Sequence, residues 1–237
     1  MDKDLVAIPC YNESLNLEKF LPKLEKARGP FDVIFVNDGS TDATKEILEK
    51  HRYAVISHEK NRGYSSAIRT GLSHALSKNY EYVCFIDSDG QHDPQYAAPA
   101  FRRVREENAD LLIGSRFVEN THYRGAASRR LGMIFFRFLV KAFTGKDIHD
   151  TTSGFKVFNP KAMRLALAEP RLKDFHAEFL VYLLREGCRV VEMPVTVHSR
   201  EHGRSMYTWK DCVVYPFKTF WAVLGILYII KKGRGVS

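Results

Sequence analysis

The chain has 237 residues, enough for one large domain or for one domain with a small appendage. Its content of 45% hydrophobic and 27% charged residues is that of a globular protein with its own core, which excludes a disordered chain. The net charge of +8 suits anionic lipid or phosphorylated ligands, and because no nucleic-acid-binding motif accompanies it we expect no nucleic-acid partner.

The first half alternates between short apolar runs and segments with helical periodicity. Strands are expected over residues 5–9, 31–36, 53–57, 82–86 and 111–113. Helices are expected over residues 13–27, 43–50, 61–76 and 94–107, with Pro94 in the first turn of the last one. This alternation predicts an α/β fold of the Rossmann-like kind, with a mostly parallel sheet flanked by helices.

The second half is less regular. We expect an amphipathic helix over residues 131–143, a strand over 155–158, a helix over 176–185 and a strand over 189–198 that Pro194 interrupts. Residues 212–230 are strongly apolar and aromatic. We therefore divide the chain into a main domain of residues 1–208 and a C-terminal apolar segment with a basic tail, 209–237.

Two features of the sequence indicate the cellular compartment of the protein. The four cysteines are far apart and form neither a CxxC pair nor a zinc-type spacing, which favours a reducing, cytoplasmic environment. The start of the chain, Met1-Asp2-Lys3-Asp4, is acidic and leads directly into an apolar run, so we expect no secretory signal there.

Polar clusters follow three of the expected strands directly. They are Cys10-Tyr11-Asn12-Glu13, Asn37-Asp38-Gly39-Ser40 and Asp87-Ser88-Asp89. Because the carboxyl ends of parallel strands meet at one edge of a sheet, where ligands bind, we expect the three clusters to form one site.

The acidic triplet is a candidate metal site. Asp87 and Asp89 flank a single residue, and Mg²⁺ and Mn²⁺ prefer carboxylate oxygens; Gln91 could supply a further neutral oxygen. A metal here would neutralise a departing diphosphate. The alternative is a turn with two solvated aspartates, since Asp-x-Asp also arises by chance, and the neighbouring clusters favour the metal.

Several motifs in register give the chain a resemblance to glycosyltransferase family 2, which has the GT-A fold. The motifs are Ile8-Pro9-Cys10-Tyr11-Asn12-Glu13, Val36-Asn37-Asp38-Gly39-Ser40-Thr41-Asp42, Asn61-Arg62-Gly63 and Asp87-Ser88-Asp89-Gly90-Gln91-His92-Asp93-Pro94. A closer resemblance, to the dolichyl- and polyprenyl-phosphate sugar synthases of that family, comes from Gly114-Ser115-Arg116, Thr152-Ser153-Gly154-Phe155 and Arg200-Glu201-His202-Gly203-Arg204-Ser205. The match extends from residue 5 to about residue 208.

The resemblance implies roles for individual residues. A nucleoside pocket would be lined by Pro9, Tyr11 and Glu13, with Asp38 near the base. The metal and the donor diphosphate would be held by Asp87, Asp89 and Gln91, with Ser88 in the same donor site. The acceptor phosphate would be bound by Arg116, Arg129 and Ser153. The donor diphosphate would also be gripped by Arg200 and Ser205. Of these, the expected catalytic residues are Asp89, Arg116 and Arg200.

Some of these positions depart from the family or have a structural alternative. The family usually has Lys or Asn after Ser205, whereas this chain has Met206, so that loop neutralises less donor charge or Arg204 compensates. Asp38 could simply shape a turn, and Arg129 could lie on a solvated helix start. Glu178 could be an exposed charge or a pocket residue.

The implied acceptor determines the mechanism. A phosphate monoester, with a second pKa near ~6, is largely dianionic at neutral pH and can attack the anomeric carbon without a general base. Direct displacement would invert the anomeric centre. The enzyme must then bring two anionic groups together, using a metal and arginines. The expected activity is transfer of a hexose from GDP-mannose, UDP-glucose or UDP-N-acetylhexosamine to polyprenyl or dolichyl phosphate.

A lipid acceptor requires contact with a membrane. Residues 212–230 number about 19, close to the ~20 that cross a bilayer, but Pro216 and Lys218 weaken a spanning interpretation. The aromatic residues suit an interfacial position, so we expect peripheral attachment to the cytoplasmic face, with residues 131–143 docking beside this segment. The alternative is that both segments are core helices.

Two other functions stay open at this point. One is a transferase of the same family that acts on a glycan hydroxyl, with Glu178 or Asp150 as the base. The other is a subunit that binds a nucleotide-sugar without turnover. The donor base, the sugar and the oligomeric state do not follow from the sequence.

Overall fold

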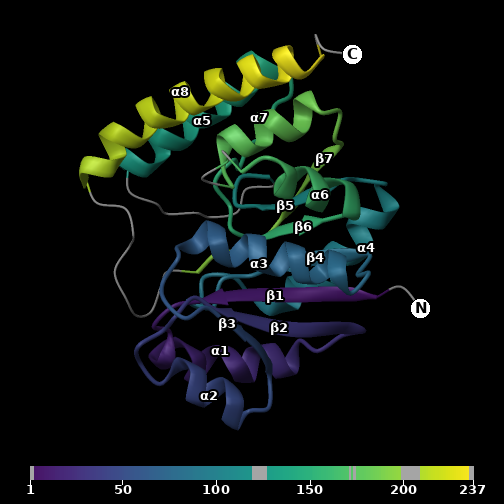
Figure 1. The fold of residues 1–237 in the computed structure, drawn as a ribbon, viewed down its shortest axis with the longest axis vertical. Helices are drawn as coiled ribbons and strands as arrows, with labels where there is room; N and C mark the ends of the chain where they lie inside the picture. The colour runs from purple at the N-terminus through teal and green to yellow at the C-terminus, as the bar shows by residue number, and fades with distance from the viewer. Residues whose placement is uncertain (1–2, 119–126, 171, 173–174, 199–208, 235–237) are drawn as a thin grey trace.

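The computed structural model describes residues 3–118, 127–170, 172, 175–198 and 209–234 (Figure 1). Within its helices, the side chains of residues 127–131, 209–216, 229 and 231–234 lie outside the description.

A single seven-stranded sheet with the order β3-β2-β1-β4-β6-β5-β7 forms the centre of the molecule. The strands are β1 (Asp4–Cys10), β2 (Phe31–Asn37), β3 (Ala54–Ser57), β4 (Tyr82–Phe85), β5 (Leu111–Ser115), β6 (Lys156–Phe158) and β7 (Val190–Pro194). All neighbours are parallel except β6, which runs antiparallel to both β4 and β5. The predicted mostly parallel α/β sheet is confirmed.

The helices lie close to the expected positions. They are α1 (Ser14–Lys26), α2 (Thr44–Lys50), α3 (Tyr64–Ser77), the 3₁₀ turn η1 (Pro94–Tyr96), α4 (Ala97–Glu106), α5 (Ala127–Thr144), α6 (Pro160–Ala168), α7 (Ala177–Arg185) and α8 (Trp209–Arg234). Helix α6 was not predicted, although Asn159 caps it by accepting from the Ala162 N–H and Pro160 fills its first position. Strand β7 ends at Pro194 rather than at residue 198, because proline has no N–H for the ladder.

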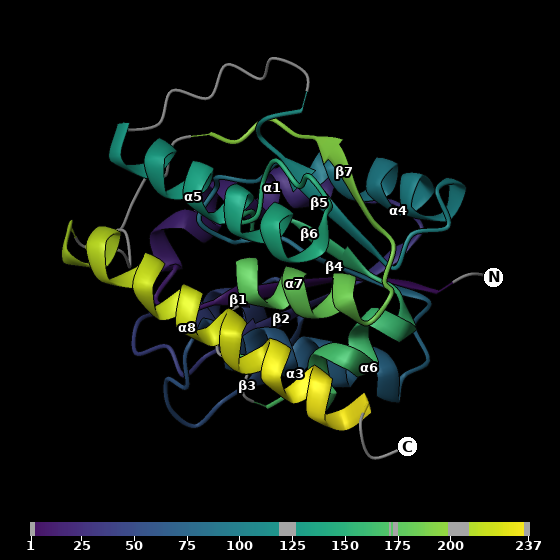
Figure 2. The same ribbon diagram turned by 90° about the horizontal axis from the view of Figure 1, so that it is seen from above.

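Side-chain alternation along the strands produces two cores, one on each face of the sheet. In β1, Leu5 and Ala7 join one core while Val6 and Ile8 join the other. The first core is covered by α3, α5, α6, α7 and α8, and the second by α1, α2 and α4 (Figures 1 and 2). The loops that follow the parallel strands meet at one edge of the sheet, where a site can form.

Helix α8 packs across α5 and α7, and the side-by-side course of α5 and α8 is clear in Figure 2. Val223, Ile226 and Ile230 on its inner side belong to the first core. Its outer side carries exposed aromatic residues, among them Trp221 with 69% of its surface exposed. Within the part of the chain that the structure describes, no helix has the length and apolarity needed to span a membrane.

Arg69 of α3 fastens the chain segment that follows α6. Its guanidinium donates to the carbonyl oxygens of Ala166 (2.9 Å), Glu169 (2.8 Å) and Leu172 (2.9 Å). The same group lies 5.7 Å from the centre of the Phe175 ring. One guanidinium thus satisfies three backbone carbonyl groups at and just after the C-terminal end of α6. These hydrogen bonds hold the segment after α6 against α3.

Replacing Arg69 with methionine is expected to lower the free energy of unfolding by roughly 2–3 kcal/mol, because three carbonyl groups lose a charged donor while most of the aliphatic side chain is kept. Urea unfolding followed by circular dichroism measures the change. Arg102→Met on the exposed side of α4 is the matched control and should shift stability by less than ~0.5 kcal/mol. Equal effects of the two substitutions would contradict the role assigned to Arg69.

Candidate active site

The loops after β1 and β2 are joined to each other by hydrogen bonds. The Asn12 N–H donates to Ser40 Oγ (3.0 Å), and the Thr41 N–H donates to Asn12 Oδ1 (2.8 Å). The Glu13 N–H donates to Thr44 Oγ1 (2.8 Å). Two of the three polar clusters are therefore one rigid unit, as their places after neighbouring parallel strands predicted.

The residues expected to line a nucleoside pocket lie on this unit. Pro9 is buried near the end of β1, and its carbonyl oxygen accepts from Ser88 Oγ (3.1 Å), which connects the first cluster to the acidic triplet. Tyr11 is 42% exposed and presents an aromatic ring at the rim. Glu13 is half-buried and accepts from Asn16 Nδ2 (2.5 Å).

Asp38 is buried, and three donors from its own chain surround its carboxylate. His58 Nδ1 lies 2.6 Å from Oδ1, the Arg62 N–H donates to Oδ1 (2.9 Å) and the Gly63 N–H donates to Oδ2 (2.8 Å). Gly63 has φ +90°, a conformation that other residues adopt rarely. Asp38 thereby fixes the loop that leads into α3. Its expected position near a base stays a prediction.

The acidic triplet follows β4 at the centre of the same edge. Ser88 and Asp89 are buried, and Asp89 Oδ1 accepts from the Gln91 N–H (3.0 Å). The side chain of Asp87 is 25% exposed. Burial, the largest effect, and the nearby charge of Asp89 raise the pKa of Asp87, although His92 acts against them. The site thus holds a carboxylate whose charge the folded protein disfavours.

Two neighbours crowd the Oδ2 side of Asp87. Gly154 comes so close that a Cβ atom at that position would overlap with Asp87 Oδ2, so a larger residue could not be accommodated without moving the carboxylate. His92 is buried with Nδ1 at 3.4 Å from the same oxygen. Burial lowers the pKa of His92, so its ring is neutral at physiological pH.

The donor set fits a hard divalent cation. Mg²⁺ and Mn²⁺ are held by one or two carboxylates and keep their other positions for water and phosphate oxygens. Asp87 and Asp89 supply two carboxylates, and the amide nitrogen of Gln91 donates to the His198 carbonyl oxygen (3.4 Å), so the amide oxygen could serve as a third ligand. Among the described residues, no group of three or more His, Cys, Asp or Glu side chains forms a closed metal site.

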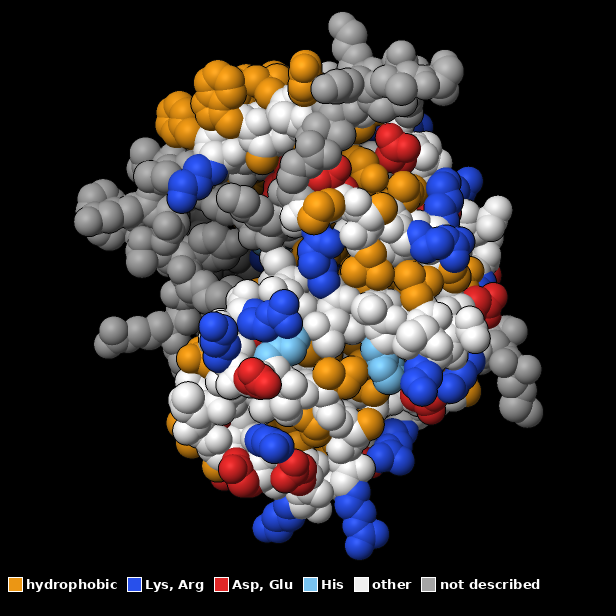
Figure 3. Space-filling model, viewed as in Figure 1, with side chains coloured by type: hydrophobic (Ala, Val, Ile, Leu, Met, Phe, Trp, Pro, Cys, Tyr) orange, Lys and Arg blue, Asp and Glu red, His pale blue; other side chains and the backbone are white. Residues whose placement is uncertain are grey.

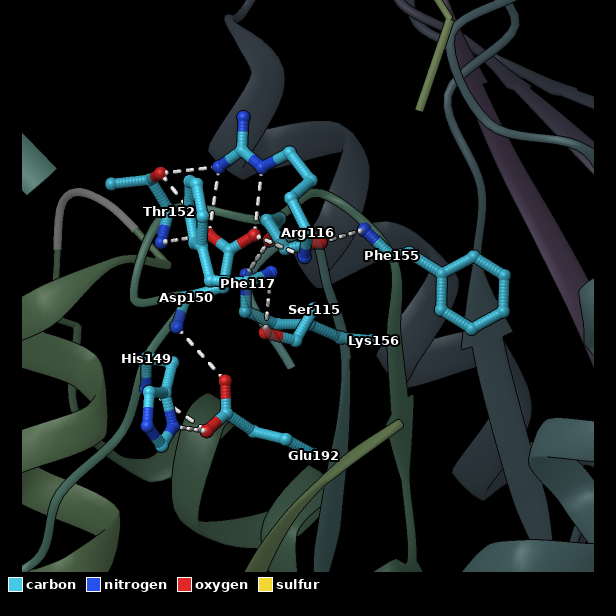
Figure 4. A network of polar contacts seen from close by, with 10 residues as sticks. Ser115, Arg116, Phe117, His149, Asp150, Thr152, Phe155, Lys156 and Glu192 are labelled. Atoms are coloured by element: carbon cyan, nitrogen blue, oxygen red, sulfur yellow. Dashed lines mark hydrogen bonds and ion pairs between the residues drawn. The ribbon is translucent and has the colours of Figure 1, made fainter. Parts of the chain in front are cut away.

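Arg116 lies in a second, arginine-centred cluster (Figure 4). Its Nε and Nη2 donate to the two oxygens of Asp150, each at 2.7 Å, and Nη2 also donates to Thr152 Oγ1 (2.7 Å). The Asp150 side chain is fully buried. Glu192 of β7 holds the loop that contains Asp150, because its carboxylate accepts from the N–H groups of His149 and Asp150, both at 2.9 Å.

The ionisation state of Asp150 follows from this pairing. Burial alone would raise the pKa of Asp150, but the hydrogen bonds and charge of Arg116 outweigh burial and hold that pKa below its ordinary value. An aspartate with a lowered pKa and both oxygens engaged is a poor general base. The cluster is therefore suited to orienting a guanidinium group rather than to removing a proton.

Ser153 and Lys156 lie between the two clusters. Ser153 is buried, its Oγ accepts from the Phe155 N–H (3.2 Å), and its carbonyl oxygen accepts from the ammonium of Lys156. Burial lowers the pKa of Lys156 to about 8, against the attraction of Asp150 and Asp87. Gly154 lies against Asp87, and Thr152, two residues earlier, accepts from Arg116, so the metal-type cluster and the arginine cluster adjoin each other at one site.

The structure thus brings together ten residues predicted for the site, which are Pro9, Tyr11, Glu13, Asp38, Asp87, Ser88, Asp89, Gln91, Arg116 and Ser153. The side chain of Arg129, and Arg200, Arg204, Ser205 and Met206 entirely, lie outside the described residues. Sequence reasoning missed Tyr64, Thr152 and Lys156. Thr152 stood in the Thr152-Ser153-Gly154-Phe155 motif but was given no role, and Lys156 stood out as a lysine inside an otherwise apolar strand. Tyr64 had no signal in the sequence.

The family model described as "Glycosyl transferase family 2" matches residues 5–165, more than half of the chain. The chain therefore belongs to glycosyltransferase family 2. The matched segment contains both clusters of the site, and the resemblance drawn from the motifs is confirmed.

Curated relatives match over most of their length. The polyprenol monophosphomannose synthase of Mycolicibacterium smegmatis is 28% identical, covering 99% of this chain and 91% of the relative. The undecaprenyl-phosphate mannosyltransferase of Micrococcus luteus is 29% identical, covering 85% of this chain and 86% of the relative. The UDP-N-acetylglucosamine–dolichyl-phosphate N-acetylglucosaminyltransferase of Methanococcus voltae is 23% identical (96% and 95%).

Solved structures with the same fold include two bacterial proteins. Glucosyl-3-phosphoglycerate synthase from Mycobacterium tuberculosis, in complex with Mn²⁺, UDP and phosphoglyceric acid, superposes with a TM-score of 0.69 at 17% identity, covering 95% of this chain and 78% of that one. TarS 1–349 from S. aureus gives a TM-score of 0.58 at 18% identity, covering 98% of this chain and 74% of that one. These likenesses confirm the GT-A fold.

Replacing Asp87 with asparagine is expected to raise the urea midpoint of the metal-free protein at neutral pH. A raised pKa of Asp87 means that the folded state disfavours the ionised carboxylate, so its charge costs stability above its ordinary value of 3.8. The difference in urea midpoint between Asp87→Asn and wild type should vanish below pH 3.8, where the carboxyl group is protonated in both the folded and the unfolded state. Urea titrations in EDTA across this pH range measure it.

Asp110→Asn is the matched control. The Asp110 carboxylate accepts from Asn159, Lys161 and the Arg189 N–H, and these donors outweigh burial and lower its pKa. Its removal should therefore lower the midpoint at neutral pH, the opposite sign from Asp87→Asn. A loss of stability in both variants would contradict the account of the acidic triplet.

Proposed function

We propose that this protein is a metal-dependent, inverting hexosyltransferase that moves a sugar from a nucleotide-sugar to a polyprenyl or dolichyl phosphate at the cytoplasmic face of a membrane. The observation that carries the proposal is the meeting, at one edge of the sheet, of an acidic pair suited to a metal and an arginine cluster suited to a phosphate. The names of the relatives support the same acceptor class, since each includes a polyprenol or a lipid phosphate.

The acidic side of the site would take the donor. Asp87, Asp89 and Gln91 would hold Mg²⁺ or Mn²⁺, which supplies the positive charge that a departing diphosphate needs. The exposed ring of Tyr11 and the adjoining Glu13 are placed to receive the nucleoside. Arg200 and Ser205 keep their proposed role at the diphosphate.

The basic side would take the acceptor. Asp150 holds the plane of the Arg116 guanidinium by two parallel hydrogen bonds, so the cation is oriented before substrate arrives. Ser153 and Arg129 complete the proposed phosphate site. A phosphate monoester is already dianionic at neutral pH and can attack without a base, which agrees with the engagement of Asp150 by Arg116.

Transfer assays test this directly. The purified protein, with Mn²⁺ or Mg²⁺ and a polyprenyl phosphate, is incubated separately with radiolabelled GDP-mannose, UDP-glucose and UDP-N-acetylglucosamine, and the product is extracted into organic solvent. We expect label in the organic phase with one of these donors and its loss in EDTA. Arg116→Lys should lower kcat/KM for the lipid phosphate by roughly 10²-fold, since lysine cannot form the planar, bidentate pair.

Two results would contradict the proposal. Transfer of label to a polyprenol without phosphate, or to a water-soluble glycan, would place the acceptor in the hydroxyl class. Nucleotide-sugar binding without turnover on any acceptor would leave a binding subunit as the function.

The face formed by α5 and α8 supports attachment to a membrane surface. Large hydrophobic side chains project from it with more than half of their surface exposed, namely Ile134, Phe138, Phe217, Trp221 and Tyr228. Figure 3 shows hydrophobic side chains gathered at the top of the molecule, where Figure 1 places α8. Lys218 is exposed on the same helix and suits anionic headgroups. Inner residues of α8 pack in the core, so the helix would lie on the bilayer.

Vesicle binding tests the role of this face. Trp221→Glu and Phe138→Glu are each expected to lower the partition coefficient onto anionic phospholipid vesicles about tenfold, because each removes a large apolar group from the contact. Sedimentation with the vesicles measures it. Leu15→Glu is the matched control, since Leu15 is 63% exposed on α1 at the opposite end of the molecule (Figure 1), and it should have no effect. Equal loss in all three variants would contradict the assignment.

A further inference from the structure

Asp87 is held from both halves of the chain. On the Oδ1 side, the hydroxyl of Tyr64 donates to the carboxylate at 3.0 Å. On the Oδ2 side, Gly154 lies in close contact and His92 is 3.4 Å away. Tyr64 is the first residue of α3, 23 positions before Asp87, and no motif of the sequence includes it.

The position of Tyr64 is itself fixed by the site. Asp38 accepts from the N–H groups of Arg62 and Gly63, the two residues that precede Tyr64. The ring of Tyr64 packs against the first core and lines a small pocket together with Ile68 of the same helix. The hydroxyl is therefore presented to Asp87 by a loop and a ring that have little freedom.

The chemistry of the contact favours a metal ligand. A carboxylate has about four lone-pair sites, and Tyr64 occupies one of them, so coordination positions on Asp87 stay open. A phenol is neutral at physiological pH and orients the carboxylate without cancelling its charge, whereas a lysine or arginine in the same place would compete with a cation. Hydrogen bonds of this kind to a metal-binding carboxylate commonly affect metal affinity.

We propose that Tyr64 is a positioning residue for the metal ligand Asp87, held in place through the Asp38 loop. The inference rests on the proposed function, because it assumes that Asp87 binds the divalent cation. It also gives Asp38 a second task, since the residue expected near the base then orients the metal site through Arg62, Gly63 and Tyr64.

Tyr64→Phe tests the inference, with binding of Mn²⁺ alone to the metal-free protein as the readout. The variant keeps the ring that fills the core and loses only the hydroxyl, so we expect it to fold. Electron paramagnetic resonance of free Mn²⁺ gives the Kd, which should rise about tenfold relative to wild type.

Tyr80→Phe is the matched control. The Tyr80 hydroxyl also donates to an aspartate, Asp32 Oδ2 at 2.6 Å, but Asp32 lies at the start of β2, at the opposite edge of the sheet from Asp87. Tyr80→Phe should lower the urea midpoint and leave the Mn²⁺ affinity unchanged.

The outcomes separate the two claims. If wild type binds Mn²⁺ and Tyr64→Phe binds it equally well, the positioning role is overturned while the metal site stands. If both tyrosine variants weaken Mn²⁺ binding equally, the effect is general destabilisation, and the positioning role again fails. If wild type binds no Mn²⁺ and Asp87→Asn changes nothing, the metal site of the proposed function fails with it.

Discussion

The site depends on two carboxylates, Asp87 and Asp89, held at the carboxyl edge of a parallel sheet. β4 lies next to β1, so its end meets the polar loops that follow β1 and β2. Burial, and after it the nearby charge of Asp89, raises the pKa of Asp87, so the folded protein disfavours a charge on this carboxyl group. The free-energy cost of an ionised Asp87 is offset by the stability of the two cores, and a bound cation would lower that cost. The electrostatic conflict at the acidic triplet is the feature around which the remaining groups are arranged.

Positively charged residues from the second half of the chain lie beside the acidic triplet. Arg116 is oriented by Asp150, and Asp150 by Glu192, so three elements of structure fix one guanidinium. Lys156 lies on β6, between β5, which leads to Arg116, and β4, which leads to Asp87. Such an arrangement suits a reaction in which two anionic substrates must meet, because each would encounter charge of opposite sign on its own side of the site. The antiparallel strand β6, which carries Lys156, brings the two sides together.

Much of the fold followed from local pattern. Apolar runs alternating with helical segments gave the parallel strands, and polar residues after strand ends gave the position of the site. The direction of β6 did not follow, because a strand of only three residues carries no information on its partner. Contacts between distant residues were equally out of reach: Arg116 pairs with Asp150 34 positions later, and Tyr64 meets Asp87 through a turn whose geometry depends on Asp38. The residues that gather at the candidate site were largely predictable from strand ends and motifs, whereas the residues that hold them in place were not.

In the proposed function the metal and the nucleotide depend on each other, since Asp87, Asp89 and Gln91 would hold a cation that neutralises the donor diphosphate. Calorimetric titration of the protein with GDP and with UDP, in Mn²⁺ and in EDTA, measures that dependence most directly. We expect one of the two nucleotides to bind in Mn²⁺ and its affinity to fall at least tenfold in EDTA, with the same coupling seen when Mn²⁺ is titrated in the presence of that nucleotide. Binding of equal strength in Mn²⁺ and in EDTA would show that the acidic triplet does not bind the nucleotide through a metal.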